Sequence, residues 1–233
     1  MKNNALLLLV LSVALVSRAA EPAPVASGSY RLDLEANAAA PFPFLSKFGT
    51  VKIAAWPGGV RAETVWLNAF SKTGSPTLTV MNPFARMYTD IPLRDIGSIV
   101  RKLKGDESSL VPDASFPMDP AVLPGTVRGI PATRHRMILG DSFIDIWVTK
   151  AIPRNPQLEA IEHSFIRSIS PGVADAVRKL PGTPIFVELN TRRFKKVTVL
   201  KLIAIQRPGE GEKEALQTGS FFMRAPLLEA LWK

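Results

Sequence analysis

The stretch from Val197 to Gln206 reads Val-Thr-Val-Leu-Lys-Leu-Ile-Ala-Ile-Gln, and it restricts the fold more than any other part of the chain. Successive side chains of a strand point to opposite faces. Strict alternation therefore predicts apolar side chains on both faces, with Val197, Val199, Ile203 and Ile205 on one and Leu200, Leu202 and Ala204 on the other. Because apolar surface on both sides has to be covered, we expect helices against one face and a packed core or a cavity against the other.

Short strands are expected through most of the remaining chain. Residues 29–36 alternate between apolar and charged side chains, which indicates a strand with one face in solvent. Segments 51–56 and 60–66 flank Pro57-Gly58-Gly59, a turn signal because proline fixes φ and glycine allows positive φ. Further strand pairs are expected at 77–81 with 86–91, 132–139 with 143–149, and 184–189 with 195–206. Consecutive strands joined by tight turns indicate an antiparallel sheet.

Helical spacing of apolar side chains occurs at residues 95–103, 158–169 and 173–180, and Pro171 divides the last two segments. Residues 106–128 are rich in Pro, Asp and Ser, so we expect a long loop there and consider it a candidate lid. No internal repeat and no sharp change of composition is present, which predicts a single domain.

The first twenty residues read as a cleavable signal peptide. Lys2 precedes an apolar run from Ala5 to Val16, and small residues then lead to a cleavage site near Ala19 or Ala20. A membrane anchor is disfavoured, because a helix of about twelve residues rises about 18 Å and a bilayer core is about 30 Å thick. We therefore expect a periplasmic or secreted protein with residues 1–20 removed, a flexible leader at 21–28 and one domain at 29–233.

The chain has no cysteine, which excludes disulfides and lipidation of an N-terminal cysteine. Such a composition fits a bacterial exported protein. Without Lys2 and Arg18, 27 basic residues stand against 20 acidic ones, and the net charge is +7. After export, anionic lipid or polysaccharide is a better partner for this charge than nucleic acid, and solubility alone explains the charge better still. The densest basic run comprises Arg192, Arg193, Lys195 and Lys196. We expect it to be either a hairpin tip that contacts anionic headgroups or a solvated turn.

One segment resembles a catalytic motif. Gly140-Asp141-Ser142-Phe143 is similar to the nucleophile block of GDSL-type lipases and esterases, which also have a late Asp-x-x-His. Here the block lies in mid-chain between two strands, and neither His135 nor His163 has an Asp three residues before it. We interpret the block as a hairpin turn.

The two histidines give no metal or cofactor prediction. Without cysteine they cannot complete a structural zinc site, and no nucleotide-binding motif is present. Glu159 and Glu162 flank His163 on a predicted helix, which we interpret as a solvated face. A carboxylate pair of the glycosidase kind stays open, because the fold decides which carboxylates meet.

Two segments carry a family resemblance. One is Gly129–Thr133 followed by Ile146–Thr149, and the other is Leu180–Glu188 followed by the strand to Gln206 and by Phe221-Phe222. Their order resembles a family of uncharacterised exported bacterial proteins, a domain of unknown function whose fold is similar to the lipoprotein carrier LolA. The resemblance implies an α+β fold, an antiparallel incomplete β-barrel (a LolA-like half-barrel) with a few helices packed on its concave face. It implies an apolar concave surface for acyl chains and offers no catalytic residues.

The expected function is that of a non-enzymatic envelope protein that binds or carries a lipid, a lipoprotein or another apolar ligand. Concave apolar sites suit such ligands. The candidate lining residues, each of which could equally be packed core, are Trp56, Trp66, Trp147, Phe186 and Leu202. Two alternatives stay open: an interaction module that binds an envelope partner through its basic turn or a sheet edge, and a hydrolase that uses Ser142 or carboxylates. No cofactor is expected, and the oligomeric state is not predicted.

Overall fold

The computed structural model describes residues 16–17, 28–36, 50–65, 67–96, 116–169, 171–191, 196–209 and 223–225. One sheet of 13 strands dominates this part of the chain. Neighbouring strands are antiparallel, except that β1 (Val16–Ser17) pairs with β12 in parallel, off the main path, and β13 pairs with β7 in parallel. From edge to edge the order is β13 (Met223–Arg224), β7 (Met87–Pro92), β6 (Thr77–Asn82), β5 (Asn68–Lys72), β4 (Gly59–Glu63), β3 (Thr50–Trp56), β2 (Tyr30–Ala36), β12 (Val197–Gln206), β11 (Thr183–Asn190), β10 (Ser142–Thr149), β9 (Ile130–Leu139) and β8 (Leu123–Val127).

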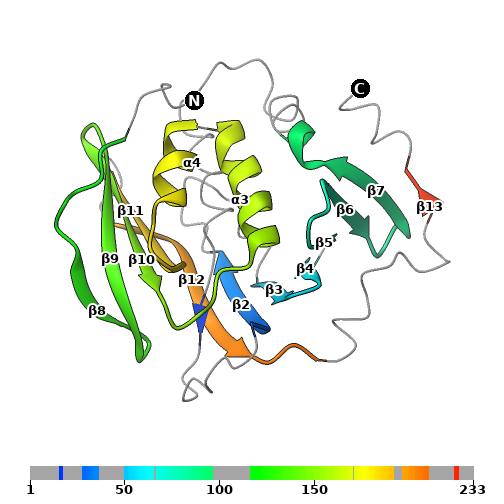
Figure 1. Ribbon diagram of the computed structural model, residues 1–233, viewed down its shortest axis with the longest axis horizontal. Helices are drawn as coiled ribbons and strands as arrows, with labels where there is room; N and C mark the ends of the chain where they lie inside the picture. Colours follow the sequence, from blue (N-terminus) through cyan, green and yellow to red (C-terminus); the bar gives the residue numbers. More distant parts are fainter. Residues whose placement is uncertain are drawn as a thin grey trace.

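The sheet is open and the fold is predominantly β. Its two edge strands, β13 and β8, do not pair with each other, so the sheet does not close into a barrel. The described helices are α3 (Pro156–Ile169), α4 (Pro171–Arg178) and the single 3-10 turn η2 (Leu93–Asp95). Figure 1 shows α3 and α4 side by side against one face of the sheet. The expected α+β half-barrel is therefore wrong, because strands make up most of the structure and the edges stay apart.

The other expected helix, at 95–103, lies outside the described residues beyond Ile96. Pro171 divides α3 from α4, as the sequence predicts, because proline cannot continue the hydrogen bonding of a helix interior.

Bulges in β12 explain why apolar residues occupy both odd-numbered and even-numbered positions of this strand. Its register shifts between Thr198 and Leu200 against β11, and between Leu202 and Ala204 against β2. Each shift adds one residue to β12 and moves the following side chains to the other face. Leu200, Leu202 and Ile205 consequently share the core face. The expectation of two apolar faces was wrong because it assumed strict alternation.

Strand β8 corrects the expectation of a long loop at 106–128. Its hairpin with β9 turns through Arg128 and Gly129, whose φ angles are 50° and 80°. Positive φ at both central residues matches the twist of a two-residue hairpin. Gly125 lies under the Trp147 ring, where an added Cβ would come 2.8 Å from ring atom Cζ3. Residues 106–115 of the expected lid lie outside the described residues.

The core lies between the helices and the facing side of the sheet. Tyr30, Leu32 and Leu34 of β2 are at most 1% exposed, and they alternate with charged residues on the other face, as the sequence predicts. The helices contribute four larger buried apolar side chains to the same cluster, Leu158, Ile166, Val173 and Val177.

Candidate functional site

The residues expected to line an apolar site do not meet in one place. Leu202 is fully buried in the core. Trp147 and Phe186 lie opposite each other on β10 and β11 and alternate with core residues along these strands, and the half-buried Trp147 packs against the core cluster without being part of it. Trp56 is 6% exposed at the end of β3, and Trp66 lies outside the described residues. Their role in ligand binding stays a prediction.

Only Lys196 of the basic run lies in the described part of the chain, and Arg192, Arg193 and Lys195 lie outside it. The Lys196 ammonium is exposed and forms an ion pair with Glu188 at 2.9 Å. The proposed contact of this run with anionic headgroups stays a prediction.

Ser142 and the nearer histidine are too far apart for a catalytic pair. Ser142 begins β10 opposite Leu139, after the turn through Gly140 with φ 61°. His135 lies four residues further along β9, which is roughly 13 Å at the rise of a strand. Its Nε2 is 3.2 Å from the Thr133 hydroxyl, and burial lowers the pKa of the ring. Within the described residues no group of His, Asp and Glu is placed to hold a metal ion.

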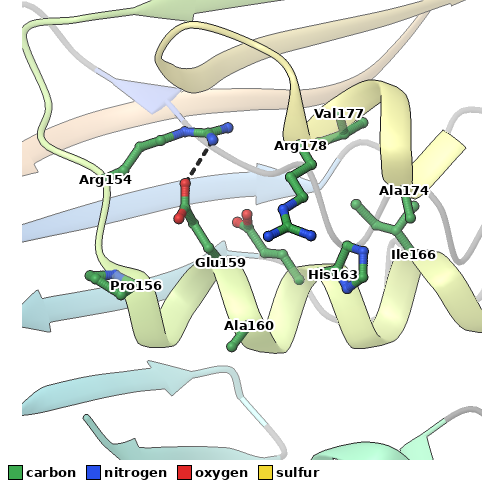
Figure 2. Close-up of a pocket in the computed structure, with 10 residues that line it drawn as sticks. Arg154, Pro156, Glu159, Ala160, His163, Ile166, Ala174, Val177 and Arg178 are labelled. Atoms are coloured by element: carbon green, nitrogen blue, oxygen red, sulfur yellow. Dashed lines mark ion pairs between the residues drawn. The ribbon is translucent and has the colours of Figure 1, made fainter. Parts of the chain in front are cut away.

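A cleft between α3 and α4 is the strongest candidate site. Its volume is about 260 Å³. Figure 2 shows charged side chains from both helices and from the segment before α3 converging on it. Its lining comprises five titratable residues, Arg154, Glu159, Glu162, His163 and Arg178, and five others, Pro156, Ala160, Ile166, Ala174 and Val177.

Helix α3 is fixed at its first turn, which places the cleft. Asn155 is the N-cap: its side-chain oxygen accepts hydrogen bonds of 3.0 Å from the backbone amides of Gln157 and Leu158. Its amide group donates to the Trp56 carbonyl of β3 at 3.0 Å. Pro156 occupies the first helical position, where the missing N–H costs nothing. The start of α3 is thus tied to the sheet.

The two carboxylates of α3 have different environments. Arg154 forms an ion pair with Glu159 at 2.7 Å, shown dashed in Figure 2. Burial raises the pKa of Glu162 from its usual 4.5 to about 8; Glu159 adds to the increase and Arg154 opposes it. At neutral pH the carboxyl group of Glu162 is therefore mostly protonated, whereas Glu159 is the carboxylate that forms the ion pair.

The remaining polar groups differ in charge and in partners. His163 Nε2 is buried and has no hydrogen-bond partner among the described residues. Burial, followed by Arg167 and Arg178, lowers the pKa of His163, so the ring is neutral at pH 7. Figure 2 shows the Arg178 side chain reaching from α4 toward α3. Beneath α3, the buried Tyr30 hydroxyl also lacks a partner among the described residues, and burial, followed by Glu162, raises its pKa.

Sequence reasoning missed Glu162 as a site residue because it interpreted the charged side of α3 as solvated. The four-residue spacing of apolar residues around Glu162 in the sequence could have identified it. Leu158, Glu162 and Ile166 are four residues apart and share one face of the helix. Leu158 and Ile166 are 8% and 1% exposed, so the carboxyl group stands within the apolar stripe.

Comparisons with known proteins show no family. No family model matches the chain, and no curated protein matches it. An uncharacterized conserved protein from Thermus thermophilus aligns over 96% of this chain and 98% of its own, with 8% identity and a TM-score of 0.44. PNGF-II aligns over 88% of this chain and 33% of its own, with 8% identity and a TM-score of 0.42. These values are too low to support an argument on fold or function, and the resemblance to the LolA-like family stays a prediction.

Proposed function

We propose that the protein is exported and binds a small ligand in the cleft between α3 and α4. The observation that carries this proposal is the cleft of about 260 Å³, with titratable groups on one side and buried apolar side chains on the other. Its volume lies just below the range of about 300–1,000 Å³ that is usual for small-molecule sites. Polar groups with shifted pKa values converging on a cleft are also typical of functional sites.

The cleft favours a small ligand over a whole lipid. A water-sized group takes up about 30 Å³ in the liquid, so this volume holds about eight or nine such groups at most. The ligand must be amphipathic, because Arg178 and Glu162 lie near Ile166 and Val177.

A blocking substitution tests the site. Ala160 is exposed and belongs to the lining of the cleft, so Ala160→Trp adds a large side chain at its rim without disturbing the core. Thermal unfolding is followed with a panel of small anionic, cationic and neutral compounds. We expect at least one compound to stabilise the wild type and the control variant Ala121→Trp, which changes an exposed alanine outside the cleft, but not Ala160→Trp. Binding that survives Ala160→Trp, or no binding by any compound, would refute the proposal.

Export is the second part of the proposal and rests on the sequence of residues 1–20. In the described part of the chain, no helix has the length and apolar character needed to cross a bilayer. Removal of these residues would also remove β1, which lies off the main path of the sheet. We expect the full chain expressed in a bacterium to be recovered outside the cytoplasm, with an intact mass that lacks roughly the first 19 or 20 residues. Recovery of the uncleaved chain from the cytoplasm would contradict export.

A further inference from the structure

The charge pattern of the α3–α4 cleft narrows the class of its ligand, an inference that rests on the function proposed above. Of the two arginines that line the cleft, Arg154 is already paired with Glu159 at 2.7 Å. Arg178 is exposed and makes no ion pair with another described residue. A single available guanidinium matches a ligand with one negative charge, because it can form two parallel hydrogen bonds with a carboxylate.

Neutral donors complete the polar half of the cleft. The buried Nε2 of the neutral His163 ring has no partner within the described residues, and in the tautomer that carries its proton on Nε2 the ring can donate to a ligand acceptor. Glu162 makes no hydrogen bond or ion pair with another described residue, and in its protonated form it donates one O–H. A dianion is disfavoured, because Glu159 stands beside the site and, among the described lining residues, only Arg178 is an available cation.

The other half of the cleft is apolar. Ile166, Ala174 and Val177 line this part of the cleft, and although they are at most 6% exposed, the apolar surface that they leave open favours a ligand with an apolar tail over a fully hydrophilic anion. The cleft holds about eight or nine water-sized groups, which corresponds to a carboxylate with a tail of about five carbons.

We propose that the ligand is a monocarboxylate with a short apolar tail, held by Arg178, His163 and Glu162. The ligand stays ionised above about pH 5, because carboxylic acids titrate near pH 4–4.5. Binding is therefore linked to the proton on Glu162: ionisation of this group removes a donor and places a negative charge beside the carboxylate. The other titratable and charged groups near Glu162 are Tyr30 on β2, Arg154 before α3, Glu159 and His163 on α3, and Arg178 on α4. Burial raises the pKa of Tyr30 and lowers the pKa of His163, so both shifts lead away from the pH range near 8 in which Glu162 loses its proton.

Hexanoate is the probe that tests this inference, with calorimetric titration of the full chain at about pH 6.5 and about pH 9. We expect binding about ten-fold weaker at the higher pH, because Glu162 loses its proton near pH 8. Glu162→Gln keeps a neutral donor, and its affinity should differ less than about two-fold between the two pH values. Arg178→Ala should lose at least about ten-fold in affinity and Arg178→Lys should recover part of it. Arg207→Ala, which removes an equal charge outside the cleft, should bind as the wild type does.

The outcomes separate this inference from the proposed function. Hexanoate affinity that is equal at both pH values, or unchanged in Arg178→Ala, overturns the carboxylate inference. Binding of another compound that Ala160→Trp abolishes, with no binding of hexanoate, overturns the inference and leaves the proposed function standing. Failure of every compound to bind overturns both. Thermal unfolding of each variant without ligand identifies a folding defect, and a variant with such a defect is replaced by Arg178→Gln or Glu162→Asn in the same comparison.

Discussion

Gln157 joins α3 to the sheet, and its truncation is expected to be the most damaging change at the base of the cleft. Its side-chain oxygen accepts a hydrogen bond from the Gly74 amide at 2.9 Å. Its side-chain nitrogen donates to the Ser71 hydroxyl at 2.7 Å and to the Ser75 carbonyl at 2.9 Å. Gln157 is 4% exposed, so water does not replace these partners in the folded protein. The three bonds link the first turn of α3 to the β5–β6 hairpin.

The expected loss in free energy of unfolding follows from the hydrogen bonds that Gln157→Ala removes. Each buried hydrogen bond contributes about 1 kcal/mol net, and a buried partner left unsatisfied costs more. Gln157→Ala removes three bonds and leaves the Gly74 amide and the Ser75 carbonyl without this partner. We expect the free energy of unfolding to fall by about 3–4 kcal/mol.

Urea unfolding monitored by tryptophan fluorescence measures this loss. Gln206→Ala is the matched control, because Gln206 is exposed at the end of β12, and its cost should stay within about 0.5 kcal/mol. A double-mutant cycle with Ser71→Ala should give a coupling energy of at least about 0.5 kcal/mol. If Gln157→Ala costs no more than Gln206→Ala, the side chain does not hold α3 to the sheet and the reasoning is wrong.

Three further substitutions test the packing of the sheet by the same unfolding measurement. Gly182→Ala should cost about 1–3 kcal/mol, because the new Cβ would lie 2.5 Å from the Thr149 carbonyl oxygen; a neutral result would show that the backbone yields there. Gly125→Ala should cost about 1–2 kcal/mol and change tryptophan fluorescence, because the Cβ would displace the Trp147 ring; an unchanged spectrum would contradict this. Asp145→Asn should cost about 3 kcal/mol, because this buried carboxylate accepts two hydrogen bonds from Arg136, at 2.7 and 2.9 Å; a cost below about 1 kcal/mol would show that the pair is not important.

The alternation of β2 and the break between α3 and α4 at Pro171 could be predicted from the sequence because both depend on local chemistry. Residues 29–36 alternate strictly, and β2 forms there. The bulges of β12 could not be predicted, because register depends on the partner strands on both sides. Strand β8 was missed because Pro124 and Gly125 are rare in strands, while an edge strand tolerates both.

The cleft could be predicted only in part. The helical stripe of Leu158, Glu162 and Ile166 is visible in the sequence and marks a carboxyl group that α3 turns inward. The approach of Arg178 depends on the angle between α3 and α4, which no spacing rule supplies. Tyr30 comes from a strand 132 positions before Glu162, and only the sheet order brings it beneath α3.

The half-buried acid of the cleft, Glu162, also predicts how stability depends on pH. The pKa of Glu162 is about 8 in the folded protein and about 4.5 in the unfolded chain, so the folded state holds this proton more tightly. The stability that this group contributes is complete below about pH 4.5, declines as the pH rises, and is lost above about pH 8. At about 1.36 kcal/mol per pKa unit the limit is roughly 5 kcal/mol, and solvent in the open cleft reduces the expected value to about 2 kcal/mol.

Glu162→Gln removes this dependence because the amide does not ionise. We expect the variant to be about 2 kcal/mol more stable than the wild type at pH 9 and to differ little from it at pH 5, as measured by urea unfolding at both values. Glu162→Leu should stabilise the protein further at pH 9, because leucine continues the apolar stripe of α3. The same variant should lose hexanoate binding, because it lacks the carboxyl group of Glu162. A leucine variant that gains stability and still binds hexanoate would show that Glu162 is not part of the site. If the difference in free energy of unfolding between the wild type and Glu162→Gln is the same at pH 5 and pH 9, the carboxyl group of Glu162 ionises normally. The proton-linked binding proposed for the cleft would then lose its basis.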